Sequence, residues 1–240
     1  MNIFLDLDNT IFPSKFAYEY ALERLEVHFQ QKYKVPFRKL YEKKRAETKE
    51  QLLNHSSNRL RILYFKKMFD ELFGTLSIKE SLNLEEKYFH FFLEGARSFY
   101  KINNKDFKDL YSNLNLIAKK NQIAILTNEN LRTQLLKLNI FFPAFSTLKI
   151  QLFCSEEIGV EKPSKEFFEY CLKKMKSKPK DTIMIGDSLK DDIEGAMNQG
   201  INAIHVLEMF GDYEYLKENQ HKKKKYQEVK NVNRALELVR

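Results

Sequence analysis

Four short apolar runs constrain the fold of this chain more than any other feature of its sequence. They read NIFLDLD, QIAILTN, DTIMIGD and INAIHV, and they begin at residues 2, 122, 181 and 201. Each run is continuous rather than alternating, as expected for a strand that is covered on both faces. Helical patterns over residues 129–138, 164–177 and 189–199 separate the later runs. This alternation of strand and helix predicts an α/β fold with a parallel sheet.

A long helical insert follows the first run. Between residues 14 and 104, apolar residues recur at three- and four-residue spacing, and no strand-like run is present. This pattern predicts an all-helical domain inserted after the first strand. The remaining segments, residues 1–13 and 105–240, would then form one Rossmann-like core with helices flanking its sheet.

Composition is typical of a soluble globular protein, with 43% hydrophobic and 31% charged residues. No apolar run approaches the ~18 residues of a membrane span. Asp6 and Asp8 interrupt the only apolar stretch near the start, which argues against a signal peptide. Cys154 and Cys171 lie in apolar surroundings and are interpreted as reduced core thiols. A cytoplasmic location is therefore expected.

The net charge of +8 is concentrated near the end of the chain. Residues 217–240 hold eight Lys and Arg residues against three Glu residues, so the positive surplus is local. A groove-wide positive potential, as nucleic-acid binding requires, is not expected. The segment is predicted to be a solvated tail, although its HKKKK stretch could also touch RNA or an anionic surface.

Small polar residues end three of the predicted strands. The carboxyl ends of parallel strands share one edge of the sheet, where ligands bind. Asp6, Asp8, Thr127 and Asp187 are therefore expected to converge. Two carboxylates this close repel each other unless a cation compensates them or they have different roles.

The residues at this edge suit phosphoryl transfer. One of the two aspartates can attack phosphorus while the other gives a proton to the leaving oxygen. The Thr127 hydroxyl, with the N–H groups that open the next helix, is expected to bind an anion. Lys162 precedes a helix that Ser164 could cap, and its charge would neutralise a phosphoryl group.

The stretch GDSLKDD indicates metal binding at the same edge of the sheet. Asp187 follows a glycine, and Asp191 and Asp192 lie shortly after it. Carboxylate oxygens are the ligands that Mg²⁺ prefers, together with water and substrate phosphate. Either Asp191 or Asp192 could be the second acid on the metal side; the spacing favours Asp192.

Taken in order, the segments DLDNT, TN, KP and GDSLKDD resemble the four motifs of the haloacid dehalogenase (HAD) superfamily. The resemblance covers residues 1–13 and about 105–208. The helical insert at residues 14–104 resembles the cap domain that many members carry after the first strand. A single one of these motifs is weak, but four in order at predicted strand ends and helix starts are specific.

The resemblance implies a role for each matching residue. Asp6 matches the nucleophile that forms an aspartyl-phosphate and binds Mg²⁺. Asp8 matches the general acid/base, whose backbone carbonyl is a further metal ligand. The other implied roles are phosphate binding by Thr127, Asn128 and Lys162, metal binding by Asp187, and a supporting metal or water contact by Asp192.

The motif wording also separates branches of the superfamily. Its dehalogenases lack an acid at the position of Asp8, and its sugar-phosphate mutases tend to have glycine at the position of Asn9. DLDNTIFP is similar to the DxDNTLYP wording of pyrimidine-nucleotidase-like members. We therefore expect a Mg²⁺-dependent phosphomonoester hydrolase acting on a small phosphorylated metabolite, with nucleoside monophosphates first and sugar phosphates second.

Two alternative functions stay open from the sequence. A phosphotransferase or phosphomutase of the same fold would pass the phosphoryl group to an acceptor other than water. A non-catalytic binding protein would use the cap and the basic tail to hold a partner, although such a protein has no need for both Asp6 and Asp8. The oligomeric state, monomer or dimer, is also open.

Other residues are less legible. Glu129 stands where the family often has glycine, and its carboxylate could weaken anion binding. Arg59 and Arg61 of the cap could reach an anionic substrate group or be solvated. The aromatic residues of the last cap helix could stack on a base or form the core of the bundle; they are Phe89, Phe91, Phe92, Phe99 and Tyr100. His55, His90 and His205 have no ligand spacing and receive no role.

Overall fold

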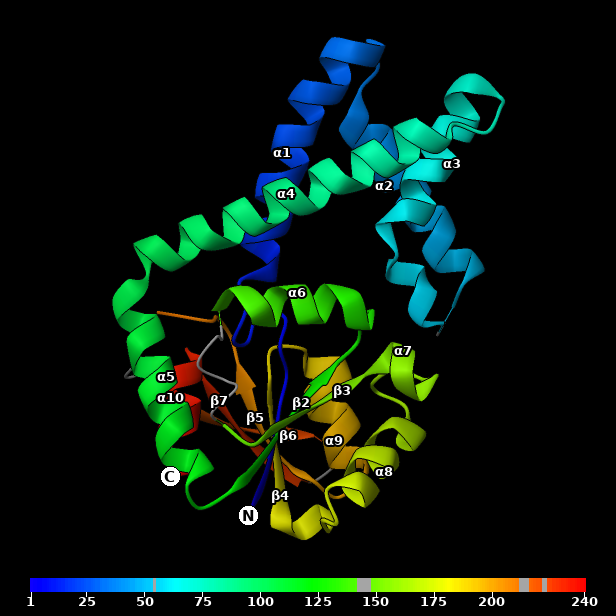
Figure 1. Cartoon of the computed structure of the whole chain (residues 1–240). Coiled ribbons are helices and arrows are strands. Elements are labelled where there is room, and N and C mark those ends of the chain that lie inside the picture. The colour runs from blue at the N-terminus through cyan, green and yellow to red at the C-terminus, as the bar shows by residue number, and fades with distance from the viewer. Residues whose placement is uncertain (54, 142–147, 212–215, 222–223) are drawn as a thin grey trace. The chain divides into compact units, whose positions relative to one another are not determined.

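The computed structural model divides the chain into two compact units (Figure 1). It describes all residues except 54, 142–147, 212–215 and 222–223. The first unit, the core unit, comprises Met1–Pro13 and Tyr100–Arg240, and the second, the helical unit, comprises Ser14–Phe99. The division after Phe99 falls slightly before residue 104, the predicted end of the helical domain.

A seven-stranded, mostly parallel sheet forms the centre of the core unit, and this confirms the predicted fold class. Its strand order is β3-β2-β1-β4-β5-β7-β6, and only β6 runs antiparallel to its neighbour β7. The strands are β1 Asn2–Leu5, β2 Gln122–Thr127, β3 Ile150–Cys154, β4 Thr182–Gly186, β5 Asn202–Val206, β6 Leu216–His221 and β7 Lys224–Val229.

The register of the sheet brings the ends of three strands to one level. Strand β1 lies between β2 and β4, so the strand order extends from β1 to both sides of the sheet. In open α/β sheets, ligands bind beside such a switch in strand order. Leu5 pairs with Ile125 on one side and with Ile185 on the other. The backbone N–H of Asp6 continues this ladder and donates to the Ile185 carbonyl at 2.9 Å.

Helices cover both faces of the sheet (Figure 1). The helices of the core unit are α5 Asn104–Ala118, α6 Leu131–Phe141, α7 Ser155–Ile158, α8 Lys165–Lys174, the 3₁₀ turn η3 Pro179–Asp181, the π-helical turn η4 Leu189–Glu194, α9 Gly195–Asn198 and α10 Val232–Glu237. Phe167 and Phe168 of α8 and Ala196 of α9 pack on the sheet residues Phe4 and Met184. The other face carries α5 and α10, which contact each other.

The described part of the segment from residue 217 onward is folded, so the prediction of a solvated tail was wrong. It supplies the hairpin of β6 and β7, and α10 packs against α5, β5 and β7. Val229, Val232 and Leu236 are fully buried. The basic side chains of the described part, such as Lys217 and Lys225, point outward. Lys222 and Lys223 of the HKKKK stretch lie outside the described residues.

The helical unit is built from α1 Ser14–Tyr33, α2 Phe37–Gln51, the 3₁₀ turn η1 Ser56–Arg59, α3 Arg61–Phe73 and α4, which runs over Ile78–Ile102 into the core unit. Aromatic side chains fill its interior: Phe29 lies 5.2 Å from Phe37, and Tyr88 stacks on Phe92 at 5.8 Å between ring centroids. Phe92 is therefore a core residue of the bundle, in agreement with the second of the two alternatives given for these aromatic residues.

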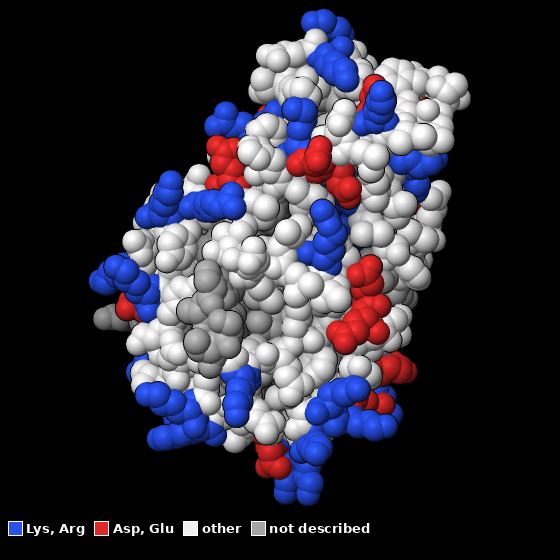
Figure 2. All heavy atoms as spheres, viewed as in Figure 1, with Lys and Arg blue, Asp and Glu red and all other residues white. Residues whose placement is uncertain are grey.

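Two surface properties complete the description. On the face shown in Figure 2, Lys and Arg side chains are spread in small groups with acidic side chains between them. Among the described residues, no helix combines the length and the apolar character needed to cross a membrane.

Candidate active site

The turn after β1 presents two carboxylates to the carboxyl edge of the sheet. Asp6 is 5% exposed and follows the last residue of the strand directly. Asn9 adopts a left-handed conformation with φ 62°, which asparagine tolerates better than most residues, and its N–H donates to the Phe12 carbonyl at 2.7 Å. This tight turn begins directly after Asp8 and is closed by a bridge between Asp8 and Phe12, so Asp8 lies close to the strand end.

Three carboxylates form a compact cluster that suits a divalent cation. One oxygen from each of Asp6, Asp187 and Asp192 lies within 4.8 Å of the other two. Asp6 follows β1, Asp187 follows β4, and Asp192 lies in the π-helical turn η4. This all-oxygen set fits Mg²⁺, which binds through carboxylates and keeps several waters. Asp191 does not belong to the cluster, so the geometry agrees with the spacing that favoured Asp192.

Gly186 makes room for this arrangement. A Cβ atom added at residue 186 would lie 2.3 Å from Oδ2 of Asp192, closer than any real contact. Asp192 itself is held at both oxygens, because its Oδ2 accepts from the Ser188 N–H at 3.0 Å and its Oδ1 from the Lys162 ammonium at 2.6 Å. Glycine is therefore required at position 186, because a side chain there would clash with the carboxylate of Asp192.

Lys162 is the buried counter-charge of the cluster. Its ammonium donates to Asp6 Oδ1 at 2.7 Å, to Asp192 Oδ1 at 2.6 Å and to the Leu126 carbonyl at 2.8 Å. Burial alone lowers the pKa of Lys162, but the two carboxylates outweigh burial and raise this pKa above its ordinary value. Lys162 is thus a fixed positive charge beside the predicted nucleophile.

One lysine does not compensate the cluster fully. Burial raises the pKa of Asp6 well above its ordinary value, the charge of Lys162 opposes the rise, and three neighbouring carboxylates add to it. Burial and the charge of Asp192 likewise raise the pKa of Asp187 to about 6. A divalent cation between these oxygens would reverse both shifts, because it favours the ionised carboxylates.

Asn128 links the second motif to the third. Its side-chain Nδ2 donates to the Lys162 carbonyl at 2.8 Å, and its Oδ1 accepts from the Lys162 N–H at 2.7 Å. Both ends of the amide therefore hold the backbone of Lys162 in place. Ser164 caps α8 as predicted, accepting from the Phe167 N–H at 3.3 Å. The phosphate-binding role predicted for Asn128 would fall to its backbone.

Two backbone N–H groups at the start of α6 already have acceptors in the protein. The N–H of Leu131 donates to Glu156 Oε2 at 2.8 Å, and the N–H of Thr133 donates to Asn130 Oδ1 at 2.9 Å. Protein oxygens therefore satisfy these two donors, and the anion site at the start of this helix stays a prediction. The Glu129 carboxylate accepts from the N–H and the side-chain amide of Asn130 through its Oε1, at 3.1 Å and 2.9 Å.

Asp8 is surrounded by donors, two of which the sequence reasoning missed. Lys137 forms an ion pair with Asp8 Oδ1, and Gln134 Nε2 donates to Asp8 Oδ2 at 2.8 Å. The Thr127 hydroxyl also donates to Oδ2, at 3.3 Å, and accepts from Gln134 Nε2 at 2.5 Å. Gln134 and Lys137 lie three residues apart on one face of α6, which is the available sequence signal.

His205 is a further residue that received no role from the sequence. Its Nε2 lies 3.0 Å from the backbone carbonyl of Asp187, and its Nδ1 lies 3.1 Å from Oε2 of Glu228. The ring therefore connects the loop that carries Asp187 to strand β7. It supports the cluster from behind without belonging to it.

A model of the family haloacid dehalogenase-like hydrolase matches residues 1–200 of the chain. The chain belongs to this family. The resemblance stated from the four motifs is thereby confirmed, and the protein is a hydrolase of the HAD type. The matched residues include Asp6, Asp8, Lys162, Asp187 and Asp192.

Known proteins support this assignment over nearly the whole length of the hydrolase. Ribulose-1,5-bisphosphate 5-phosphatase of Halopiger xanaduensis is 28% identical over 206 residues, covering 84% of this chain and 82% of the relative. The structure of the HAD-hydrolase YfnB from Bacillus subtilis, bound to magnesium, gives a TM-score of 0.62 at 21% identity, covering 99% and 97% of the two chains. A 2-haloacid dehalogenase from Pseudomonas syringae gives 0.65 at 20%, covering 100% and 98%. The two structural likenesses show the fold.

Arg61, one of the two arginines predicted to bind substrate, contacts other residues of the helical unit. Arg61 places its guanidinium 5.8 Å from the ring centroid of Tyr18 and 5.7 Å from that of Tyr88, and it donates to the Arg59 carbonyl at 2.5 Å. Both arginines are half-buried. A role in binding substrate stays a prediction for them.

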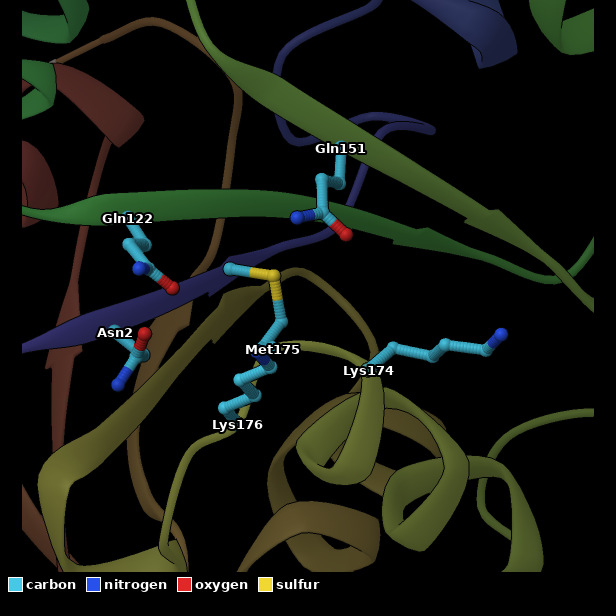
Figure 3. A pocket seen from close by; sticks show the side chains of 6 residues that line it. All are labelled: Asn2, Gln122, Gln151, Lys174, Met175 and Lys176. Atoms are coloured by element: carbon cyan, nitrogen blue, oxygen red, sulfur yellow. The ribbon is translucent and has the colours of Figure 1, made fainter.

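The hydrolase also has a polar pocket at the amino ends of its strands, opposite the carboxylate cluster (Figure 3). Asn2 and Gln122 begin β1 and β2, and Gln151 lies near the start of β3. Met175 points toward these strand ends, whereas the Lys174 side chain extends away. The lining contains amides, lysines and one methionine, and no carboxylate. This pocket therefore differs in chemistry from the carboxylate cluster at the opposite edge of the sheet.

Proposed function

We propose that this hydrolase is a Mg²⁺-dependent phosphomonoesterase that acts through an aspartyl-phosphate on Asp6. One observation carries the proposal: the Asp6 carboxylate belongs both to the three-carboxylate cluster and to the Lys162 ion pair, while the second acid, Asp8, lies outside the cluster. The first carboxylate is proposed to attack phosphorus beside the metal, and the second, outside the cluster, is proposed to transfer the proton.

In the first half of the reaction, a carboxylate oxygen of Asp6 attacks phosphorus in line with the leaving oxygen. The bond from phosphorus to the leaving oxygen breaks, and protonated Asp8 gives its proton to that oxygen. Lys162 stabilises the negative charge that develops on the phosphoryl oxygens. The Thr127 hydroxyl, once it gives up its 3.3 Å contact with Asp8, and the backbone of Asn128 are proposed to hold the phosphoryl group.

In the second half, Asp8 takes a proton from a water molecule. The water attacks phosphorus, the bond from phosphorus to the Asp6 oxygen breaks, and inorganic phosphate leaves. Bound Mg²⁺, held by Asp6, Asp187, Asp192 and the backbone carbonyl of Asp8, would supply positive charge that offsets the phosphate. The carboxylate cluster and the raised pKa of Asp187 support this metal assignment.

The substrate is proposed to be a small phosphorylated metabolite. The wording DLDNTIFP favours nucleoside monophosphates. The relative named ribulose-1,5-bisphosphate 5-phosphatase favours sugar phosphates as the second class. We propose that the helical unit acts as a cap that selects among them and that Arg59 and Arg61 meet an anionic group of the substrate.

A reducing compartment, the cytoplasm, is the proposed location. Cys154 and Cys171 are free, buried thiols. Burial raises the pKa of Cys154 to about 12 and the pKa of Cys171 above its ordinary value, so both stay protonated and behave as core residues.

The test measures phosphate release from nucleotides, sugar phosphates and 4-nitrophenyl phosphate, with Mg²⁺ and with EDTA. We expect turnover that needs Mg²⁺ and that is absent in Asp6→Asn. Adding sugars and alcohols to the assay distinguishes a phosphotransferase, which would yield new phosphate esters. If folded wild-type protein released no phosphate from any substrate, phosphotransfer or partner binding would replace hydrolysis as the proposed function.

A further inference from the structure

We infer that Lys137 and Gln134 of α6 are positioning residues that fix the Asp8 carboxyl group for proton transfer. The inference rests on the proposed function, because it concerns the general acid of that reaction. It assigns to α6 a role that none of the four motifs contains. It also predicts that the two lysines of the site, Lys162 and Lys137, serve different carboxylates.

The contacts fix the orientation of the Asp8 side chain. Lys137 pairs with one carboxylate oxygen, and Gln134 binds the other at 2.8 Å. Because each oxygen has its own donor, the carboxyl group cannot rotate without losing one of these contacts. Thr127 adds a longer contact of 3.3 Å to the oxygen that Gln134 binds. The orientation of Asp8 is therefore set from α6 and the end of β2.

Lys137 is buried, whereas the Asp8 carboxylate that it binds is partly exposed. The side chain of Lys137 is 3% exposed, whereas the side chain of Asp8 is 28% exposed. The ammonium of Lys137 also lies 5.6 Å from the ring centroid of Phe12, which belongs to the turn after β1. Lys137 is thus enclosed by the protein, and a face of Asp8 remains open to a reactant.

A structural role alone does not explain the choice of these side chains. A lysine and a glutamine on the buried face of a helix must be desolvated, which costs stability unless every polar atom is paired. Gln134 is fully buried, and among the described residues no donor reaches its Oε1 atom. The buried Gln134 amide therefore costs stability through its unbonded Oε1 atom, yet its Nε2 atom contacts Asp8 and Thr127.

The two carboxylates of the DLD segment consequently have separate cations. Lys162 holds Asp6 together with Asp192, in the part of the site that compensates charge. Lys137 forms its ion pair with Asp8, which lies outside the cluster. Substitution of Lys137 should thus affect proton transfer to the leaving oxygen more than it affects Mg²⁺ binding.

The test compares two leaving groups that differ in their need for an acid. 4-Nitrophenolate leaves without much help, whereas an alkoxide must be protonated. For Lys137→Met, we expect kcat on the best alkyl phosphate of the panel to fall by ~10²-fold, within the range of general acid catalysis. On 4-nitrophenyl phosphate, kcat should fall much less. Lys137→Arg should recover part of the activity, and Lys120→Met, at an exposed position of the core unit, should match wild type.

A double variant tests whether Lys137 acts through Asp8. In an Asp8→Asn background, Lys137→Met should cause little further loss on the alkyl phosphate, since the residue that it positions is already removed. The same comparison with Gln134→Met should give the same pattern. Thermal unfolding of each variant, with and without Mg²⁺, identifies any that fail to fold, and the Lys137→Arg variant then carries the test.

Three results would overturn the inference. An equal loss on both leaving groups, with KM raised, would show that Lys137 binds the phosphoryl group instead. Additive losses in the double variant would show that it acts independently of Asp8. Wild-type activity of Lys137→Met on the alkyl phosphate would show that the ion pair has no role in the reaction. Failure of the proposed function would look different, because wild type itself would then release no phosphate.

Discussion

Asp6 and Asp8 differ in their surroundings although only one residue separates them. Asp6 is buried between Lys162, Asp187 and Asp192, whereas Asp8 is partly exposed and bound from α6. General acid catalysis contributes ~10²–10⁴-fold, so Asp8→Asn should lower kcat on an alkyl phosphate by about this factor. Steady-state kinetics measure the loss. An unchanged kcat would remove Asp8 from the mechanism.

The cluster also separates two neighbouring acids. Asp192 contacts Lys162 and belongs to the cluster, while Asp191 lies outside it. Substituting a residue that supports a metal typically weakens affinity by ~10–100-fold, so Asp192→Asn should raise the Mg²⁺ concentration for half-maximal activity by about that factor. Asp191→Asn is the matched control and should leave it unchanged. The reverse order would exchange the two assignments.

The raised pKa of Asp187, about 6, makes the effect of Mg²⁺ depend on pH. An aspartate in the unfolded chain has a pKa of about 4, so the metal-free folded protein binds this proton more tightly. The resulting stability is present below pH ~4 and is lost as the pH rises through about 6. Mg²⁺ needs the ionised form and should therefore raise the melting temperature more at pH 7.5 than at pH 5. Calorimetry at both values checks this, and an equal rise would contradict it.

At the scale of elements, continuous apolar runs were a dependable signal. All four are parallel strands in the structure. Strands that are covered on both faces need apolar residues at successive positions, and the sequence shows this as a continuous apolar run. Strand β3 was missed because polar Gln151 interrupts its run. The β6–β7 hairpin and α10 were missed because the many lysines there suggest solvent, although Tyr226, Val229 and most of α10 are buried.

The corrected assignment of α10 has a measurable consequence. Leu236 is fully buried where α10 packs in the core unit. Large-to-small substitutions at such sites cost about 2–5 kcal/mol, so Leu236→Ala should lower the free energy of unfolding by about that amount. Lys217→Ala, at an exposed position of β6, is the control. Urea denaturation measures both. A change below about 0.5 kcal/mol in Leu236→Ala would restore the interpretation as a solvated tail.

The site residues at strand ends and helix starts could be predicted from the sequence, whereas those inside α6 could not. Asp6, Asp187 and Lys162 follow strand ends or precede helices, and topology alone brings them together. Lys137 and Gln134 could not be identified in this way, because a lysine in a leucine-rich helix is usually solvated. Their contact with Asp8 depends on how α6 rotates against the sheet edge, which the sequence pattern leaves undetermined.

At the scale of the whole molecule, the core unit is proposed to carry out the reaction, and the helical unit is proposed to select the substrate. Arg59→Ala should then raise KM for the preferred metabolite and leave kcat on 4-nitrophenyl phosphate unchanged. Steady-state kinetics on both substrates measure this. Equal KM values for wild type and variant would argue against Arg59 as a substrate contact.

The central claim is that Asp6 carries the phosphoryl group during turnover. The most direct measurement is an acid quench of the enzyme during turnover, followed by mass spectrometry of the peptide that contains Asp6. The Asp8→Asn variant should accumulate the intermediate, because its hydrolysis lacks a base. We predict a phosphoryl group on this peptide that requires Mg²⁺ and is absent in Asp6→Asn. Steady phosphate release by Asp6→Asn would contradict the account.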